Sequence, residues 1–128
     1  MAKIGKPPLS ALENAILQVI WQRQAATAEE VRLALEPGHS LKDSTIRTVL
    51  RRLEAKGYAQ HSIEGRTYRY SPTAPAQTVA AAAVRKVIDQ FCQGSVENLL
   101  VGMVDGAVIS PKKLAQLAQK IADSKRRG

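Results

Sequence analysis

The feature that most constrains the fold of this chain is a change in the spacing of its apolar residues at Gly57. Before that glycine, apolar residues recur three or four positions apart in successive stretches, which is typical of amphipathic helices. After it, aromatic and polar residues alternate, which is typical of β-strands. The first part of the chain is therefore predicted to combine helices with a short β-structure.

Capping signals mark the starts of the first two helices. Ser10 with Glu13, and Thr27 with Glu30, are capping-box pairs, in which each residue satisfies a backbone N–H of the other. The first helix is predicted over residues 11–22. The inward-facing residues are predicted to be Leu12, Ile16, Val19 and Ile20 in the first helix, and Val31, Ala34 and Leu35 in the second.

A third helix is predicted to begin near Asp43 or Ser44, after Pro37-Gly38 has ended the second, and to stop at Gly57. Its inward-facing residues are predicted to be Ile46, Val49, Leu50 and Leu53.

Residues 58–63 and 66–71 are predicted to form two strands of a hairpin, joined by the two-residue turn Glu64-Gly65. Prolines beyond the second strand mark a domain boundary. Three helices followed by a hairpin are the winged form of the helix-turn-helix. We therefore predict a mainly α protein in which residues 1–73 form a winged-helix DNA-binding domain.

Residues 74–128 are predicted to be a helical dimerisation domain, with helices over 76–93, from Ser95 to Gly106, and from Ser110-Pro111 onward. Each helix has a narrow apolar stripe, and three such stripes make too small a core alone, so a second subunit is expected to cover them. The residues predicted to hold the dimer are Val84, Val87, Ile88, Phe91, Leu99, Leu100, Met103, Leu114, Leu117 and Ile121.

Charge and composition limit the choice of partner. The formal net charge of +8 favours a polyanion, and an aromatic content of 4% argues against stacking on single-stranded nucleic acid. The longest apolar run, residues 79–84, is far too short to span a membrane, and a single cysteine excludes a disulfide framework. A cytoplasmic protein that binds double-stranded DNA and needs no metal or other cofactor is expected.

The outward side of the third helix carries the residues best suited to reading DNA. Short hydroxyl side chains at the helix start can approach phosphates and base edges closely, and the planar guanidinium of Arg47 matches the O6 and N7 acceptors of guanine. Arginines beside the hairpin turn can hold the phosphate backbone. The predicted DNA-binding residues are Ser44, Thr45, Arg47, Thr48, Arg51, Arg66 and Arg69.

Other candidate sites are weaker. No phosphate-binding loop, nucleophile elbow or zinc-protease motif occurs, so the chain is not expected to be an enzyme. His39 and His61 lack further ligands at metal spacing and are expected to be solvated, while Trp21 is expected to belong to the core. Cys92 is either a small packed hydrophobe or a sensor of redox state or metal. The basic cluster at 125–127 is typical of a fraying terminus.

Three segments together resemble the penicillinase repressor family, which includes the β-lactamase and methicillin-resistance repressors and the copper-responsive CopY type. They are LSALENAILQVIW, STIRTVLRRLEAKGY and EGRTYRYSP, and the resemblance extends from about Leu9 to Ile121. It implies a homodimeric repressor whose winged helices each bind half of a palindromic operator. Thr45 and Arg47 match the recognition-helix contacts of the family, while Ser44 stands where relatives often have lysine.

The sequence departs from both branches of that family in the regions that respond to a signal. Antibiotic-resistance repressors are cut by a regulatory protease at an Asn-Phe bond, and alignment of LLVGMVDGAVIS places Gly102-Met103 there. Copper-responsive members carry a C-terminal pair of Cys-X-Cys motifs, which the end of this sequence lacks. A sensor protease is thus the regulatory partner that the resemblance implies, and the inducing signal and operator sequence stay open.

We predict a transcriptional repressor that blocks a promoter by occupying an inverted repeat. Two alternatives remain. A winged helix can serve as a protein-docking module, although the surface from Ser44 to Arg51 lacks the aromatic and aliphatic anchors of protein interfaces. An architectural protein that binds DNA without sequence preference would show a specificity ratio near unity.

Overall fold

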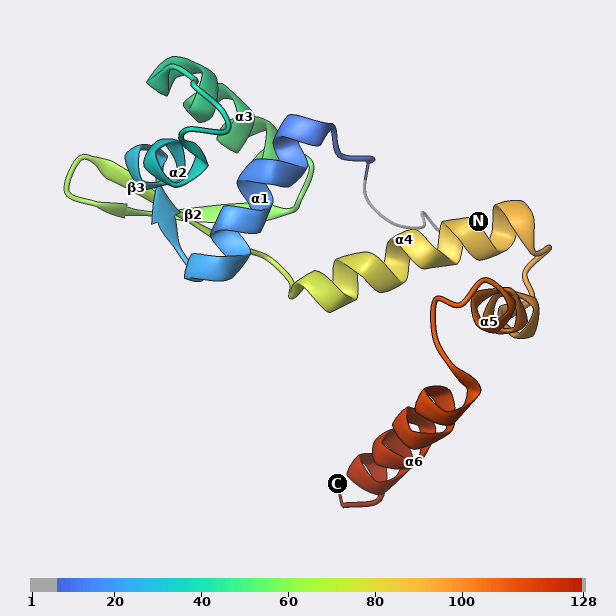
Figure 1. Cartoon of the computed structure of the whole chain (residues 1–128). Helices are drawn as coiled ribbons and strands as arrows, with labels where there is room; N and C mark the ends of the chain where they lie inside the picture. Colours follow the sequence, from blue (N-terminus) through green and yellow to red (C-terminus); the bar gives the residue numbers. More distant parts are fainter. Residues whose placement is uncertain (1–6, 128) are drawn as a thin grey trace. The chain divides into compact units, whose positions relative to one another are not determined.

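The computed structural model describes residues 7–127, which form two compact units. The first unit ends at Ala82 and the second begins at Ala83, so the division lies within helix α4 (Ala76–Phe91). Figure 1 follows the chain from the mixed helix and sheet structure of the first unit into the helices of the second. The functional boundary predicted at residue 73 stays a prediction, placed just before α4.

Three helices form most of the first unit: α1 (Ala11–Arg23), α2 (Ala28–Leu35) and α3 (Asp43–Ala55). Both predicted capping boxes are present. The Ser10 hydroxyl accepts a hydrogen bond from the Glu13 N–H at 3.1 Å, and the Ser10 N–H donates to the Glu13 carboxylate at 2.8 Å. Thr27 and Glu30 repeat this arrangement at the start of α2. Local sequence therefore sets where both helices begin.

The sheet contains β1 (Ala26–Thr27), β2 (Ala59–Glu64) and β3 (Thr67–Pro72), in the antiparallel order β1-β3-β2. The predicted hairpin exists, but its turn is Gly65-Arg66, one residue later than predicted. Gly65 has a φ of +66°, so the residue without a Cβ begins the turn, where that conformation carries the least strain. The two-residue strand β1 was not predicted, because so short a segment has no periodicity.

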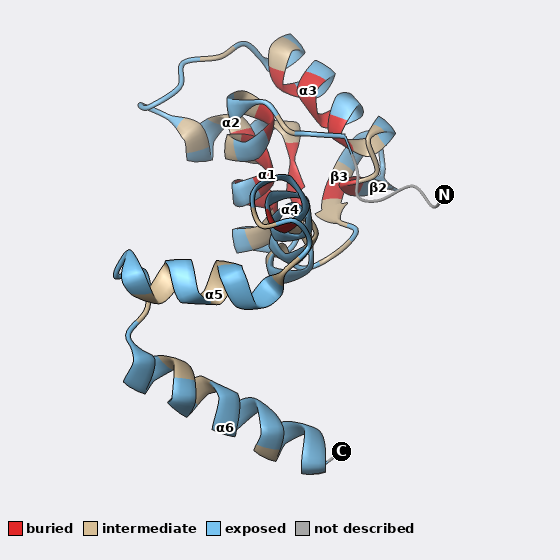
Figure 2. Ribbon diagram, turned by 90° about the vertical axis from the view of Figure 1, so that its right-hand side faces the viewer, coloured by how far each residue is buried: buried red, intermediate tan, exposed pale blue. Residues whose placement is uncertain are grey.

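The core of the first unit lies where the three helices meet the sheet (Figure 2). The predicted inward residues of α3 are all buried, as are Ile16, Val19 and Ile20 of α1. One prediction was incomplete and one was wrong. Leu17 is fully buried as well, because α1 contacts α2, α3 and β3 and so needs a broad apolar side. Ala34 is exposed, because α2 meets the core through Val31 and Leu35.

The first unit extends past the hairpin into the start of α4. The indole N–H of Trp21 donates to the carbonyl of Ala74 at 3.0 Å, which fixes the chain that follows β3 against α1. Trp21 and Val79 both pack against the core. The prediction that Trp21 belongs to the core is confirmed.

The second unit contains the rest of α4, with α5 (Val96–Asp105) and α6 (Pro111–Arg127). Helix α4 ends two residues earlier than predicted, because Gln93 and Gly94 both adopt positive φ. Ser95 and Ser110 cap the next two helices by accepting hydrogen bonds from the backbone N–H groups of Asn98 and Lys113. Helix α6 continues through the basic cluster at its end, which is therefore helical rather than a frayed tail.

Apolar side chains of the second unit are largely exposed. Among the predicted dimer residues, Ile88 is buried, but Phe91 is 73% exposed and Ile121 is 59% exposed. Helices α4, α5 and α6 make few contacts with one another in the described part of the chain. No helix that the structure describes is both long and apolar enough to cross a membrane.

Candidate nucleic-acid interface

Helix α3 places four of the predicted DNA-binding side chains on the solvent. Ser44, Arg47, Thr48 and Arg51 are exposed and Thr45 is half-buried. Their orientation follows from the helical period, since Ile46, Val49, Leu50 and Leu53 turn the opposite side into the core. The predicted outward face of this helix is confirmed. Its contact with DNA stays a prediction.

Two arginines of this face and one at the hairpin turn keep their charge available. Across residues 7–127, Arg47, Arg51 and Arg66 make no ion pair with a carboxylate. The Thr48 hydroxyl donates to the carbonyl of Ser44 at 2.9 Å, which fixes its rotamer and leaves its oxygen lone pairs as acceptors. The face thus offers guanidinium donors and small hydroxyl groups together.

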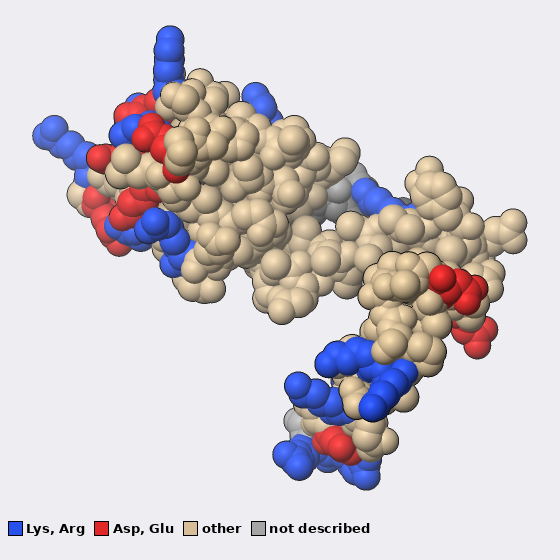
Figure 3. All heavy atoms as spheres, in the orientation of Figure 1, with Lys and Arg blue, Asp and Glu red and all other residues tan. Residues whose placement is uncertain are grey.

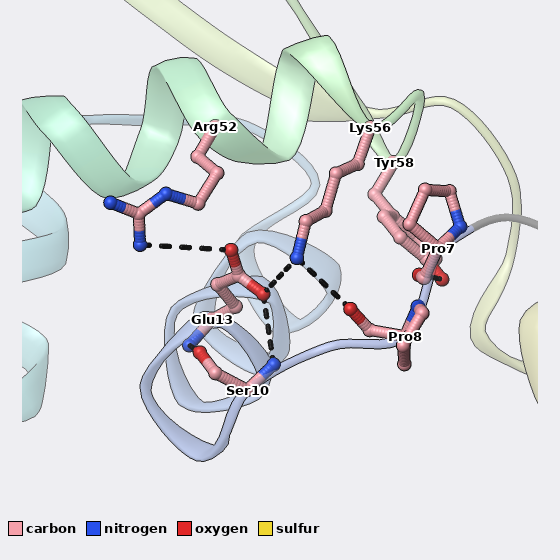
Figure 4. Close-up of polar contacts among 7 residues, drawn as sticks. All are labelled: Pro7, Pro8, Ser10, Glu13, Arg52, Lys56 and Tyr58. Atoms are coloured by element: carbon pink, nitrogen blue, oxygen red, sulfur yellow. Dashed lines mark hydrogen bonds and ion pairs between the residues drawn. The ribbon is translucent and has the colours of Figure 1, made fainter.

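The other basic residues of α3 and its C-cap serve a different purpose. Figure 4 shows Glu13 between Lys56 and Arg52. The Glu13 carboxylate lies 2.7 Å from the Lys56 ammonium and 3.9 Å from the Arg52 guanidinium. Glu13 is 1% exposed, so this pairing satisfies a buried charge. Lys56 and Arg52 are therefore committed to folding more than to DNA.

The environment of Glu13 also shows how α3 is anchored. The hydrogen bond from Lys56, followed by that from the Ser10 N–H, holds the pKa of the Glu13 carboxyl below its ordinary value. Lys56 donates in addition to the Pro8 carbonyl at 2.9 Å, and the Tyr58 hydroxyl donates to the Pro7 carbonyl at 2.6 Å. These contacts join the C-terminal end of α3 to the segment that leads into α1. We call them the Glu13 clamp.

A second ion pair holds the N-terminal end of α3. The Arg32 guanidinium of α2 lies 2.7 Å from the Asp43 carboxylate and also pairs with Glu36. Asp43 stands in the first turn of α3, where a negative charge interacts favourably with the helix dipole. Helix α3 is thus held at both ends, which fixes the direction of its outward face.

The two arginines near the hairpin turn differ sharply. Arg66 is exposed in the turn itself. Arg69 instead donates to Glu64 at 3.0 Å and to Glu30 at 3.2 Å, and these bonds raise its pKa, that to Glu64 most. The pKa of Glu30 is lowered, first by the Thr27 N–H and then by Arg69. A phosphate contact from Arg69 would have to compete with two carboxylates.

Sequence reasoning missed a link between α3 and the hairpin. The Nδ1 atom of His61 lies 2.7 Å from the Glu54 carboxylate, and its ring stacks on Tyr68 with centroids 4.1 Å apart. His61 is half-buried, so the expectation that it is simply solvated was wrong. Cross-strand pairing explains the contact. His61 lies directly opposite Tyr70 and Ile63 lies opposite Tyr68, so Tyr68 is the diagonal neighbour of His61 on the same face of the sheet. Tyr68 and Tyr70 stand two residues apart, which places both rings on one face of the strand, and this spacing was the signal available in the sequence.

The remaining candidates are separate from this interface. His39 is exposed, Cys92 is a half-buried free thiol, and within the described chain no three His, Cys, Asp or Glu side chains gather as metal ligands. Gly102 and Met103 lie within α5, where both carbonyls accept backbone hydrogen bonds. A protease that cuts between them would first have to open the helix.

Comparison with known proteins adds independent findings. The model of the penicillinase repressor family matches residues 9–123. The penicillinase repressor of Bacillus licheniformis is 25% identical over 121 residues, which cover 94% of each chain. The DNA-binding domain of the repressor BlaI, solved in solution, is 34% identical with a TM-score of 0.50, over 59% of this chain and 90% of that one. A transcriptional regulator from Thermotoga maritima shares the fold over 93% of this chain and 78% of its own, at 21% identity and a TM-score of 0.52.

Proposed function

The chain belongs to the penicillinase repressor family, and we propose that it is a homodimer that binds a palindromic operator in promoter DNA. The family consists of DNA-binding transcriptional repressors rather than enzymes. Repression then requires only occupancy of the promoter, which fits a surface of DNA-binding side chains without a catalytic arrangement. Because its proposed partner is promoter DNA, we expect the protein in the cytoplasm.

The observation that carries this proposal is the outward face of α3. It combines unpaired arginines with small hydroxyl side chains, on a helix whose two ends are anchored by the Glu13 clamp and by Asp43. In the major groove, Arg47 can donate two hydrogen bonds to a guanine. Ser44 and Thr45 precede Arg47 and Thr48 follows it, and all three are proposed to contact adjacent bases or phosphates, with Arg51 on the backbone.

The hairpin is proposed to hold the DNA backbone beside the recognition helix. Arg66 is suited to this role because it is exposed and unpaired across the described residues. Arg69 is proposed as a weaker contact, since its bonds to Glu64 and Glu30 first support the hairpin itself. Phosphate contacts of this kind raise affinity for all sequences and make it steeply salt-dependent.

The second unit is proposed to supply the dimer. Its exposed apolar side chains would be covered by the same helices of another copy, as the predicted dimer residues require. Two recognition helices on one side of the duplex would then enter successive major grooves. Half-site centres about 10 bp or a small multiple apart are expected.

The first test compares binding of the full-length protein to its own upstream promoter DNA and to random DNA of equal length across a salt series. A preference for the promoter that survives added salt supports a specific repressor, and footprinting would then locate the half-sites. Equal binding that vanishes with salt would favour the architectural alternative. No binding to either DNA would favour the protein-docking alternative.

Two substitutions separate base contacts from backbone contacts. Arg47→Ala is expected to cost about 1–3 kcal/mol on the operator and to relax the preference at one base position. Arg66→Ala is expected to weaken operator and random DNA alike. Arg85→Ala removes the same charge from α4 and serves as the matched control. Equal losses on operator and random DNA for Arg47→Ala would contradict its assignment as a base contact.

A further inference from the structure

Helix α6 holds most of the excess positive charge of the protein. Its 17 residues include six basic residues and one acidic residue, a net charge of +5 out of +8 for the whole chain. Figure 3 shows the blue basic side chains gathered on this helix, in contrast with the acidic groups on α5. A concentration of this kind has no explanation in the core, because no residue of α6 is buried.

Three of the six basic residues form one row along the helix. Lys113, Lys120 and Arg127 recur every seven residues and so form a row along one side, about 21 Å long at 1.5 Å per residue. Leu114, Leu117 and Ile121 form a second row beside it, since Leu117 is four residues from Lys113 and three from Lys120. Lys120 and Arg127 also line a surface depression, together with Gln116, Gln119, Asp123 and Ser124. We call this side the basic face of α6.

Little of this charge is neutralised within the chain. In the described part of α6, the one ion pair joins Arg126 to Asp123 at 3.0 Å. The first unit differs, since Arg32, Arg52, Lys56 and Arg69 all pair with carboxylates there. The row of Lys113, Lys120 and Arg127 therefore keeps its positive charge available to a polyanion.

We propose that the basic face of α6 is a second DNA-binding surface, which binds the phosphate backbone of duplex DNA flanking the operator. The proposal rests on the proposed function, because it concerns the DNA that flanks an operator bound by helix α3. Lysine ammonium groups are compact point charges that suit phosphates without sequence preference. A membrane surface is a poorer occupant, because α6 has no aromatic residue to anchor at an interface.

The test uses the full-length protein and two DNA fragments, one limited to the operator and one with random flanks. Lys113→Gln, Lys120→Gln and Arg127→Gln together remove the row. On the flanked DNA, the slope of log affinity against log salt should decrease by about 2–3 for each copy of the dimer that contacts a flank, and affinity at low salt should fall at least about tenfold. On the operator-only fragment, the affinity and the slope of the charge variant should stay unchanged. Binding of the wild-type protein to this same fragment tests the proposed function separately.

The matched control is the neutral triple variant Gln116→Ala, Gln119→Ala and Ser124→Ala on the same helix. It should behave as wild type on both fragments, with circular dichroism and sedimentation showing unchanged helicity and mass for both variants. Dissociation of the charge variant into monomers would overturn the proposal and make the basic face a contact between subunits. An unchanged salt slope on flanked DNA would overturn it as well.

Two further measurements identify the source of the phosphate. If the charge variant loses binding to anionic phospholipid vesicles but not to flanked DNA, the occupant is a membrane and the proposal fails. If the wild-type complex captures a second labelled duplex and flank length has no effect, the assignment to flanking DNA is overturned. Dependence on flanks in the same molecule supports the proposal.

Discussion

The two units of this protein use their apolar residues in opposite ways. In the first unit, Ile16, Leu50 and their neighbours are fully buried in one core that three helices and a sheet enclose. In the second, valines and a phenylalanine of comparable size lie on the solvent. The amount of apolar sequence is thus not what separates the two units. The two units differ in whether the chain itself supplies the residues that cover their apolar side chains.

This difference gives the two units separate roles. The first unit can hold α3 at both ends because the Glu13 clamp and the Arg32–Asp43 pair are built from its own residues. The second unit lacks such internal contacts between α5 and α6 among the described residues. A single chain therefore presents the surface that is proposed to recognise DNA, while the proposed affinity for a palindromic operator requires two chains.

Removing the second unit is expected to have the largest effect. A chain that ends after Ala82 keeps Val79 and the Trp21–Ala74 hydrogen bond, and so should remain folded. It should bind the full operator about 10²- to 10⁴-fold more weakly, because the dimer supplies a high effective concentration of the second site. Fluorescence anisotropy measures this loss, and sedimentation should show a monomer. Equal binding of the truncated and full-length proteins to the full operator would contradict the separate roles of the two units. Equal binding of the two proteins to a single half-site is expected.

A matched pair of leucine substitutions tests whether the units are independently stable. Leu50→Ala should lower the free energy of unfolding of the first unit by about 2–5 kcal/mol, because it leaves a cavity in the core. Leu117→Ala should leave that unit unchanged and weaken self-association. Trp21, the single tryptophan, reports the unfolding of the first unit in urea. A similar shift of its transition by both variants would refute the independence of the units.

The smallest expected effect concerns the Glu13 clamp. The folded state lowers the pKa of Glu13, so its contribution to stability is present above the ordinary pKa of the unfolded carboxyl and is lost as the pH falls through the lower folded value. Glu13→Gln should destabilise the first unit by about 1–3 kcal/mol at pH 7 and flatten the loss of stability in acid.

Urea denaturation from pH 7 down to about pH 3 measures both effects of Glu13→Gln. Glu29→Gln removes an exposed carboxyl from α2 and is the control. If the stability of Glu13→Gln fell with pH in parallel with wild type, the clamp would not be the origin of the acid sensitivity.

Short-range signals allowed much of the fold to be predicted. Ser10, Thr27 and Ser110 begin helices because each side chain accepts a bond from a backbone N–H three residues away. The outward face of α3 follows from four apolar residues at helical spacing. The hairpin was displaced by one residue because either Glu64-Gly65 or Gly65-Arg66 satisfies a two-residue turn, and only the packed strands choose between them.

Contacts between distant residues were not predictable in the same way. Glu13 satisfies its own capping box, so nothing in its local sequence indicates that it also pairs with Lys56 from another helix. Arg66 and Arg69 look equivalent along the hairpin, yet Glu30 from α2 neutralises only the second. The link between His61 and Glu54 depends likewise on how β2 packs against α3. Such pairs require the tertiary arrangement first.

The exposed apolar sides of the second unit also bear on how a growing cell would use this protein. In the proposed homodimer, two copies have to meet before these sides are covered, so the amount of dimer rises with the square of the copy number while copies are scarce. When a cell grows without new synthesis of the protein, dilution lowers the concentration of dimer more steeply than the total concentration of the protein. A promoter controlled in this way would respond to the balance between protein synthesis and cell division, in addition to any inducer.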